Sequence, residues 1–383
     1  MTGVIEDLDD AACRARGSVK WDLAPDGVLP AWVAETDFAP CPAVQSAVED
    51  AVARGAYGYS TFDHRTGLPE ATAAFCERHF GWDVDPGRVV LVGDVMAGVH
   101  LALTTLCEPA PVVVPTPAYP PFLDAVPLAG RELVTVPLDP DAQDAALDLG
   151  RIEAALAAGA RTVLLCNPHN PWGRAFRREE LEALRDVVLR HRARVVSDDI
   201  HAPLVLPGAR HLPYASLPGT AEHTTTVLSA SKAFNVPGLK CAQLVAGSEA
   251  DRLVLRAVPL VANHGSSPLG IVANLAAWES GDDWLAALVA RLDENRALLA
   301  RLLPERLPGV RVRPLEATYL AWLDVRCLDL DDDPSVLAER RGRVLVNDGR
   351  TFGPGGDGHV RLNIATSPDR VTEAVDRLAR AWA

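Results

Sequence analysis

The feature that most constrains the fold is a series of six short, β-branched apolar segments in the middle of the chain. Each is bounded by Gly, Pro, Asn or Asp, a pattern that is typical of buried strands. Amphipathic helical patterns, such as residues 178–192, separate several of them. Strands that alternate with helices predict a doubly wound, mostly parallel α/β sheet. The six predicted strands are residues 88–93, 111–115, 162–168, 193–199, 224–230 and 242–247.

The pattern changes after residue 280. Residues 282–307 predict one long amphipathic helix, residues 319–326 a strand, and residues 367–383 a last helix. A chain of 383 residues is long enough to bury a second core, so we expect a smaller α+β domain here. The predicted division is an N-terminal segment, 1–45, that joins the small domain, a large domain, 46–280, and the small domain proper, 281–383.

Composition excludes several classes of protein. A formal net charge of −14 argues against nucleic acid or an anionic membrane as the main partner. No apolar run approaches the roughly 20 residues that span a bilayer, and residues 1–17 lack the apolar core of a signal peptide. The cysteines are scattered and never form CxxC, which favours reduced thiols in a cytoplasmic protein and no metal site. They are Cys13, Cys41, Cys76, Cys107, Cys166, Cys241 and Cys327.

Polar side chains follow five of the predicted strands at their C-terminal ends. In open α/β sheets this edge is where ligands bind, so the sequence predicts one pocket built from several strands. In chain order the residues are Asp94, then Tyr119, then Asn167, His169 and Asn170, then Asp198 and His201, and finally Ser229, Ser231 and Lys232.

The pocket lacks the motifs of the common nucleotides. Neither GxGxxG nor GxxxxGK[ST] occurs, which argues against a nicotinamide cofactor and a nucleoside triphosphate. Instead Lys232 stands beside two serines, in a chain with only three lysines against 34 arginines. An amine forms an imine with an aldehyde, whereas a guanidinium does not. We therefore predict pyridoxal phosphate as the cofactor.

Eight motifs, in order, carry a resemblance to a known family. Six of them resemble the fold-type I, class I/II aminotransferase superfamily: YGYSTF, TPAYPPF, NPHNPWG, SDDIH, SASKAFNVPGLK and HVRLNIA. Residues 20–40 and 316–326 resemble its cystathionine β-lyase (C–S lyase) branch, the MalY/PatB-like proteins. The resemblance runs from about residue 17 to the last residue, and it implies the fold of that superfamily.

The resemblance implies roles around the cofactor ring. Lys232 resembles the lysine that carries the cofactor and moves the substrate α-proton. Asp198 resembles the carboxylate that pairs with the pyridinium nitrogen, with Asp199 as the competing candidate. His201 resembles a partner of Asp198 or of the ring oxygen, and Asn170 resembles the asparagine that bonds that oxygen.

Other residues are implied at the cofactor phosphate. The backbone amides of Met96 and Ala97 open a predicted helix, where an anion is favoured. Ser229 and Ser231 would add hydroxyl groups. Lys240 stands where transaminases usually carry arginine, and its phosphate role competes with that of a solvated surface lysine.

Three further residues complete the implied site. Tyr119 resembles the aromatic residue stacked on the ring, and its hydroxyl is a candidate acid for the leaving group. Tyr59 resembles the tyrosine that reaches the phosphate of the neighbouring subunit, which implies a homodimer with a shared active site. Arg361 resembles the arginine that holds the substrate α-carboxylate with a bidentate fork.

The expected function is a C–S β-lyase that cleaves cystathionine or a related cysteine S-conjugate to a thiol, pyruvate and ammonia. An aminotransferase is the alternative, because it needs the same residues up to loss of the α-proton. A non-catalytic binding protein is less favoured, since the implied site is intact. Thr36 and Ala317 depart from the lyase motifs in segments expected to line the substrate entrance.

Overall fold

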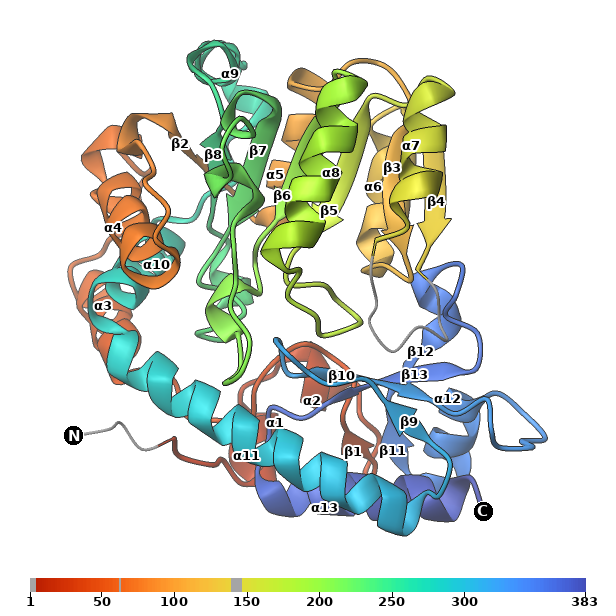
Figure 1. Cartoon of the computed structure of the whole chain (residues 1–383). Coiled ribbons are helices and arrows are strands. Elements are labelled where there is room, and N and C mark those ends of the chain that lie inside the picture. Colours follow the sequence, from red (N-terminus) through yellow and green to blue (C-terminus); the bar gives the residue numbers. More distant parts are fainter. Residues whose placement is uncertain (1–4, 62, 139–146) are drawn as a thin grey trace.

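The computed structural model describes residues 5–61, 63–138 and 147–383. Its centre is a seven-stranded sheet with the order β2-β8-β7-β6-β5-β3-β4, and a smaller sheet lies below it in Figure 1. The large sheet consists of β2 (Val89–Val92), β3 (Val112–Thr116), β4 (Leu133–Pro137), β5 (Thr162–Cys166), β6 (Arg194–Asp198), β7 (Thr224–Leu228) and β8 (Ala242–Ala246).

All six predicted strands are present, and only β8 runs antiparallel to its neighbours, β2 and β7. The predicted mostly parallel α/β sheet is therefore confirmed. The seventh strand, β4, was missed because it lies at the sheet edge and most of its residues are only half-buried. The link from Leu228 to Ala242 contains a 3₁₀ turn, Pro237–Leu239, and no α-helix of the kind that usually connects parallel strands. This link carries Lys232.

Helices cover both faces of the large sheet. On one face α5 and α6 pack against the sheet, and on the other α7 and α8 do so (Figure 1). Gly98 of α5 allows close approach, because a Cβ there would lie 2.7 Å from a methyl group of Val227. These helices are α5 (Val95–Thr105), α6 (Pro120–Leu128), α7 (Leu149–Ala157) and α8 (Arg178–Arg190).

A group of helices flanks the β2 edge of the sheet. In this group α10 packs against both α3 and α4 (Figure 1), and α9 follows β8 directly. Their bounds are α3 (Pro42–Ala53), α4 (Leu68–Phe80), α9 (Glu249–Arg256) and α10 (Pro268–Ser280).

The smaller sheet has the order β12-β13-β10-β9 and is antiparallel. The predicted long helix, strand and last helix correspond to α11, β10 and α13. The elements are α11 (Asp282–Arg306), β9 (Arg311–Val312), β10 (Leu320–Asp324), α12 (Pro334–Leu337), β11 (Val344–Leu345), β12 (Asn347–Asp348), β13 (His359–Asn363) and α13 (Pro368–Ala381).

The N-terminal segment contacts this smaller unit. Strand β1 pairs with β11, and the amide of Asp37 donates to the carbonyl of Ala365 at 3.0 Å. The division into domains at residues 45 and 280 stays a prediction. The elements of the segment are α1 (Asp10–Ala15), α2 (Val19–Asp22) and β1 (Leu29–Pro30).

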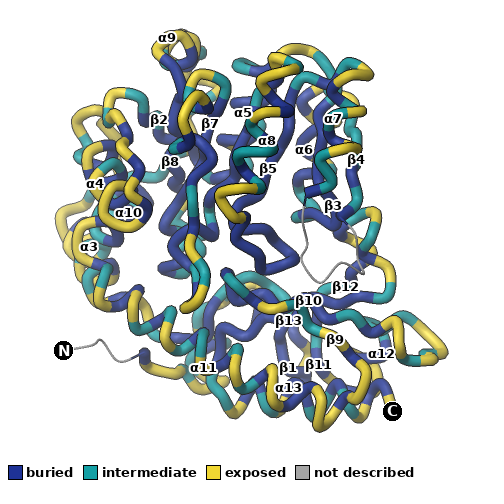
Figure 2. The backbone as a smooth tube through the Cα atoms, viewed as in Figure 1, coloured by how far each residue is buried: buried dark blue, intermediate teal, exposed yellow. Residues whose placement is uncertain are grey.

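Burial follows the layers. Figure 2 shows the strands of the large sheet buried along most of their length and the exposed residues on the outer helix turns. No helix within residues 5–61, 63–138 and 147–383 is both long and apolar enough to cross a membrane.

Candidate active site

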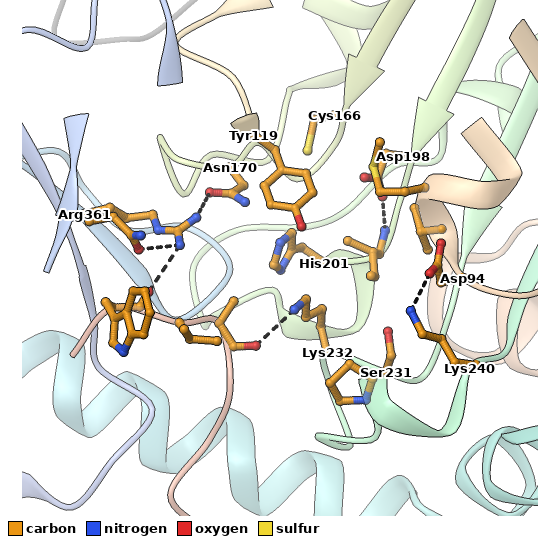
Figure 3. A pocket seen from close by; sticks show the side chains of 18 of the residues that line it. Asp94, Tyr119, Cys166, Asn170, Asp198, His201, Ser231, Lys232, Lys240 and Arg361 are labelled. Carbon is orange, nitrogen blue, oxygen red and sulfur yellow. Dashed lines mark hydrogen bonds and ion pairs between the residues drawn. The ribbon is translucent and has the colours of Figure 1, made fainter. Parts of the chain in front are cut away.

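A cavity of about 330 Å³ lies at the C-terminal edge of the large sheet, as the strand-end residues predict. Figure 3 shows its side chains converging from the large sheet and from the smaller unit. The size suits a small organic ligand, since such pockets measure about 300–1,000 Å³. The predicted site residues that line it are Met96, Tyr119, Asn170, Asp198, His201, Ser231, Lys232, Lys240 and Arg361.

Lys232 faces the cavity from the short link between β7 and β8. Its Nζ donates a hydrogen bond to the carbonyl of Ala34 at 3.0 Å (Figure 3). Burial, together with the nearby charge of Arg361, lowers the pKa of Lys232 from 10.5 to about 8. Near neutral pH the neutral amine, which is the nucleophile, is therefore far more populated than in an exposed lysine.

Asp198 ends β6 and accepts a hydrogen bond from the amide of Ile200 at 2.9 Å. Burial, with a smaller contribution from the charge of Asp199, raises the pKa of Asp198 from 3.8 to about 7. Asp199 itself is bound by Ser197 and His211 and does not line the cavity. Of the two candidate carboxylates, the structure therefore brings Asp198 to the site.

His201 and Tyr119 are held in their neutral forms. Burial and the charge of Lys232 lower the pKa of His201 to about 3, and its buried Nδ1 has no hydrogen-bond partner among the described residues. Burial also raises the pKa of Tyr119, so its hydroxyl stays protonated. A neutral imidazole and a phenol offer hydrogen bonds here without adding charge.

Arg361 is buried at the opposite side of the cavity, in β13. Its Nη1 donates to Oδ1 of Asn170 at 3.0 Å, and its Nη2 donates to Oδ1 of Asn347 at 2.6 Å and to the carbonyl of Trp32 at 3.2 Å. Sequence reasoning missed Asn347, because no motif contains it and only the pairing of β12 with β13 brings it to Arg361.

Residues 32–36, here called the 32–36 strap, form one wall of the cavity through Trp32, Val33 and Ala34. Each of its five carbonyls accepts a hydrogen bond from a side chain. The donors are Arg361 to Trp32, Asn363 to Val33 and Glu35, Lys232 and Tyr319 to Ala34, Lys20 to Glu35, and Arg16 and Asn235 to Thr36.

Thr36 and Ala317, which depart from the lyase motifs, are both buried and do not line the cavity. Their segments were expected to line the substrate entrance. The first segment lines the cavity through residues 32–34, whereas no residue of 316–326 does.

The expected phosphate end departs from the prediction at two residues. The Ser229 hydroxyl lies away from the cavity, because it donates to the carbonyl of Cys241 at 2.7 Å. The Ala97 amide donates to Asp94 at 2.8 Å, so a side chain already occupies it, and Ala97 does not line the cavity. Met96 and Ser231 do line it.

Asp94 and Lys240 form an ion pair at this end, with Nζ 2.8 Å from Oδ2. Burial alone would raise the pKa of Asp94, but the hydrogen bonds from Lys240 and Ala97 hold it below its ordinary value. Asp94 caps α5, so an anion sits at the helix N-terminus as the helix dipole favours.

Tyr59 does not line the cavity of its own chain. Its side chain is 91% exposed, and its ring centroid lies 5.4 Å from that of His264. Phe62, the last residue of the YGYSTF motif, lies outside the described residues.

The side chains present fit pyridoxal phosphate and do not suggest a metal. An aldehyde needs the amine of Lys232, a pyridinium nitrogen needs a carboxylate such as Asp198, and a phosphate needs donors such as Ser231 and Lys240. The unpartnered Nδ1 of His201 is a further polar atom that a ligand could satisfy. In the described part of the chain, no three His, Cys, Asp or Glu side chains are grouped to hold a metal ion.

Comparison with known proteins extends over nearly the whole chain. The family model "Aminotransferase class I and II" matches residues 33–378. The cystathionine beta-lyase of Corynebacterium glutamicum is 38% identical, covering 96% of this chain and 97% of its own. A solved structure from Corynebacterium diphtheriae is 38% identical, with a TM-score of 0.94 over 98% of both chains. The PLP-bound C–S lyase from Staphylococcus hominis is 25% identical, with a TM-score of 0.90 over 96% of both chains. On this similarity, the chain belongs to the class I and II aminotransferase family.

Proposed function

We propose that the protein is a pyridoxal-phosphate-dependent carbon–sulfur β-lyase. It cleaves L-cystathionine or a related cysteine S-conjugate to a thiol, pyruvate and ammonia. The observation that carries the proposal is the arrangement of an amine, a carboxylate and a guanidinium around one cavity, from Lys232, Asp198 and Arg361. The relatives named cystathionine beta-lyase and C–S lyase support cleavage of the bond to sulfur.

When bound, pyridoxal phosphate supplies an aldehyde for covalent attachment and a ring that stabilises negative charge at the substrate Cα. Lys232 would hold the aldehyde through its amine and, when a substrate amine takes its place, would be the base that moves the α-proton. Asp198 holds a proton on the ring nitrogen. Arg361 orients the substrate by a bidentate grip on its carboxylate.

The remaining cavity residues have supporting roles in this proposal. Asn170 accepts from Arg361 with Oδ1, which leaves its Nδ2 to donate to the ring oxygen. His201 bonds Asp198 or that oxygen as a neutral imidazole. Tyr119 would stack against the ring, and its protonated hydroxyl would be placed to donate a proton to the departing thiolate. At the phosphate, Ser231, Lys240 and the amide of Met96 would be the donors, the last two in place of their present contacts with Asp94.

The reaction outcome separates this function from the alternative in the same family. We expect sustained pyruvate release from cystathionine or an S-alkyl cysteine without added keto acid, because β-elimination returns the cofactor as the aldehyde. A transaminase instead leaves the amino group on the cofactor and stops until a keto acid accepts it. Pyruvate and thiol should be measured over many turnovers. Turnover that stops after one cycle and resumes only when keto acid is added would show that the protein is an aminotransferase.

We also propose a cytoplasmic homodimer with a shared active site. Tyr59 is exposed next to His264. Tyr57, close to Tyr59 in sequence, is also exposed, as are Leu260 and Val261, close to His264 in sequence. An exposed apolar cluster of this kind favours an interface. All seven cysteines are free, as suits a reducing compartment.

Replacement of Tyr59 by phenylalanine tests the shared site. If its hydroxyl binds the partner's cofactor phosphate, the affinity for pyridoxal phosphate should fall about tenfold to a hundredfold, since a hydrogen bond to a charged group contributes roughly 1.5–3 kcal/mol. Equilibrium dialysis of the cofactor gives the measurement.

Tyr57→Phe is the matched control, because that hydroxyl bonds the carbonyl of Val52 within its own chain at 3.2 Å. It should leave cofactor affinity nearly unchanged. A monomer with full activity, shown by sedimentation at the assay concentration, would rule out the shared site.

A further inference from the structure

We propose that Asn347 is a positioning residue for substrate recognition: it fixes the guanidinium of Arg361 so that the enzyme selects amino acids over the corresponding amines. The proposal rests on the function proposed above and names a residue that no motif of the chain had indicated.

The register of the smaller sheet places Asn347 against Arg361. The two residues are directly opposite each other in the antiparallel pair of β12 and β13. Opposite residues in such a pair project to the same face of a sheet. Both also line the cavity, so their contact lies at the site itself.

The hydrogen bond between them can run in only one direction, from Arg361 as donor to Asn347 as acceptor. Arginine has donors and no acceptor, so the oxygen of Asn347 must face it. The distance from Nη2 to this Oδ1 is 2.6 Å, shorter than the contacts of the same guanidinium with Asn170, 3.0 Å, and with the carbonyl of Trp32, 3.2 Å. The Oδ1 of Asn347 is thus the closest of the three oxygens that fix the orientation of the Arg361 guanidinium plane.

All three oxygens are uncharged, and this matters for the charge of the site. Arg361 is buried, and within the described residues it forms no ion pair with a carboxylate. The ring of Phe352 also lies against it, 4.9 Å from the guanidinium carbon. The charge therefore stays available for a substrate carboxylate. Asparagine can orient the guanidinium without neutralising it, which aspartate could not do.

The test compares one amino acid with the amine that lacks its carboxylate. S-Ethyl-L-cysteine and 2-(ethylthio)ethylamine share the amine and the thioether. Their dissociation constants for the cofactor-loaded enzyme can be read from the first change in visible absorbance after rapid mixing, before the amino acid is cleaved. The variants are Asn347→Ala, Asn347→Asp and, as a neighbouring control on β12, Asp348→Asn.

We expect Asn347→Ala to weaken binding of the amino acid about tenfold to a hundredfold, the range for one hydrogen bond to a charged group, and to leave the amine unchanged. Asn347→Asp should weaken the amino acid further, because the new carboxylate neutralises Arg361 and repels that of the substrate. Asp348→Asn should keep the wild-type ratio of the dissociation constants for amine and amino acid, since the side chain of Asp348 pairs with Arg350 and not with Arg361.

The proposal would be overturned if the ratio of the two dissociation constants, amine to amino acid, were unchanged in both Asn347 variants. It would also be overturned if both ligands lost affinity equally, which would indicate a merely structural role. A second measurement is independent of the cofactor: calorimetry of 3-(ethylthio)propionate, a carboxylate without an amine, with the cofactor-free protein. Asn347→Ala should bind it more weakly than wild type, and equal binding also contradicts the proposal. Failure of the proposed function shows differently, as a protein that takes up no pyridoxal phosphate while this carboxylate still discriminates the variants.

Discussion

Lys232→Ala is expected to abolish covalent cofactor attachment and essentially all turnover. The amine of Lys232 faces the cavity, and burial lowers its pKa to about 8, so it is placed to react with an aldehyde there. Borohydride treatment followed by peptide mass analysis should locate the cofactor on Lys232 in the wild type and nowhere in the variant.

Lys240→Arg is the matched control, since Lys240 is the other lysine of the cavity and pairs with Asp94 through its charge. Arginine keeps that charge, so attachment at Lys232 should persist. Normal turnover of Lys232→Ala would refute the mechanism.

The rate of attachment should also depend on pH in a particular way. Because burial lowers the pKa of Lys232 to about 8, the neutral amine of the cofactor-free protein increases about tenfold per pH unit below that value and then saturates. The rate of cofactor uptake, followed by visible absorbance, should therefore level off above about pH 8. A rate that keeps rising toward 10.5, the ordinary value for lysine, would show that the amine is not shielded.

The second large effect is expected for Asp198→Asn. Breaking a buried ion pair costs about 3–5 kcal/mol, so turnover should fall roughly a hundredfold to several thousandfold once the ring nitrogen loses its carboxylate. Single-turnover measurements with the cofactor-loaded variant give this loss. Asp199→Asn should cost much less, because Asp199 lies outside the cavity and already has two partners, Ser197 and His211. Equal losses in the two variants would contradict the assignment.

The same carboxylate should weaken the cofactor-free fold. The pKa of Asp198 is raised from 3.8 to about 7 by burial, so in that window the folded protein binds more protons than the unfolded chain. Stability should therefore fall as the pH rises from about 4 to about 7. Asp198→Asn should remove this part of the pH dependence, which urea unfolding of the cofactor-free proteins can measure. An unchanged profile would show that Asp198 is not the group responsible.

Much of this fold could be predicted because its signals are local. The buried strands are apolar and mostly rich in β-branched residues, and the polar residues at their ends also meet in space, as Asp198 and Lys232 do. Strand β4 escaped prediction because it lies at the sheet edge, where most of its residues are only half-buried and its sequence lacks a fully apolar run. The contacts of Ser229 and Asn347 were not predictable, because each depends on how the strands pair, which brings Cys241 to Ser229 and Arg361 to Asn347 from 12 and 14 residues further along the chain.

The 32–36 strap has a consequence for how this enzyme can be altered. The rest of the protein holds the strap by its main-chain carbonyls, and every residue type has the same carbonyl. The side chains of Val33 and Ala34 can therefore be exchanged without removing the bonds that fasten the segment, although both face the cavity. These two positions are accordingly suited to saturation mutagenesis and laboratory evolution. Their side chains can be varied beside the substrate while the main-chain hydrogen bonds that hold the strap are kept.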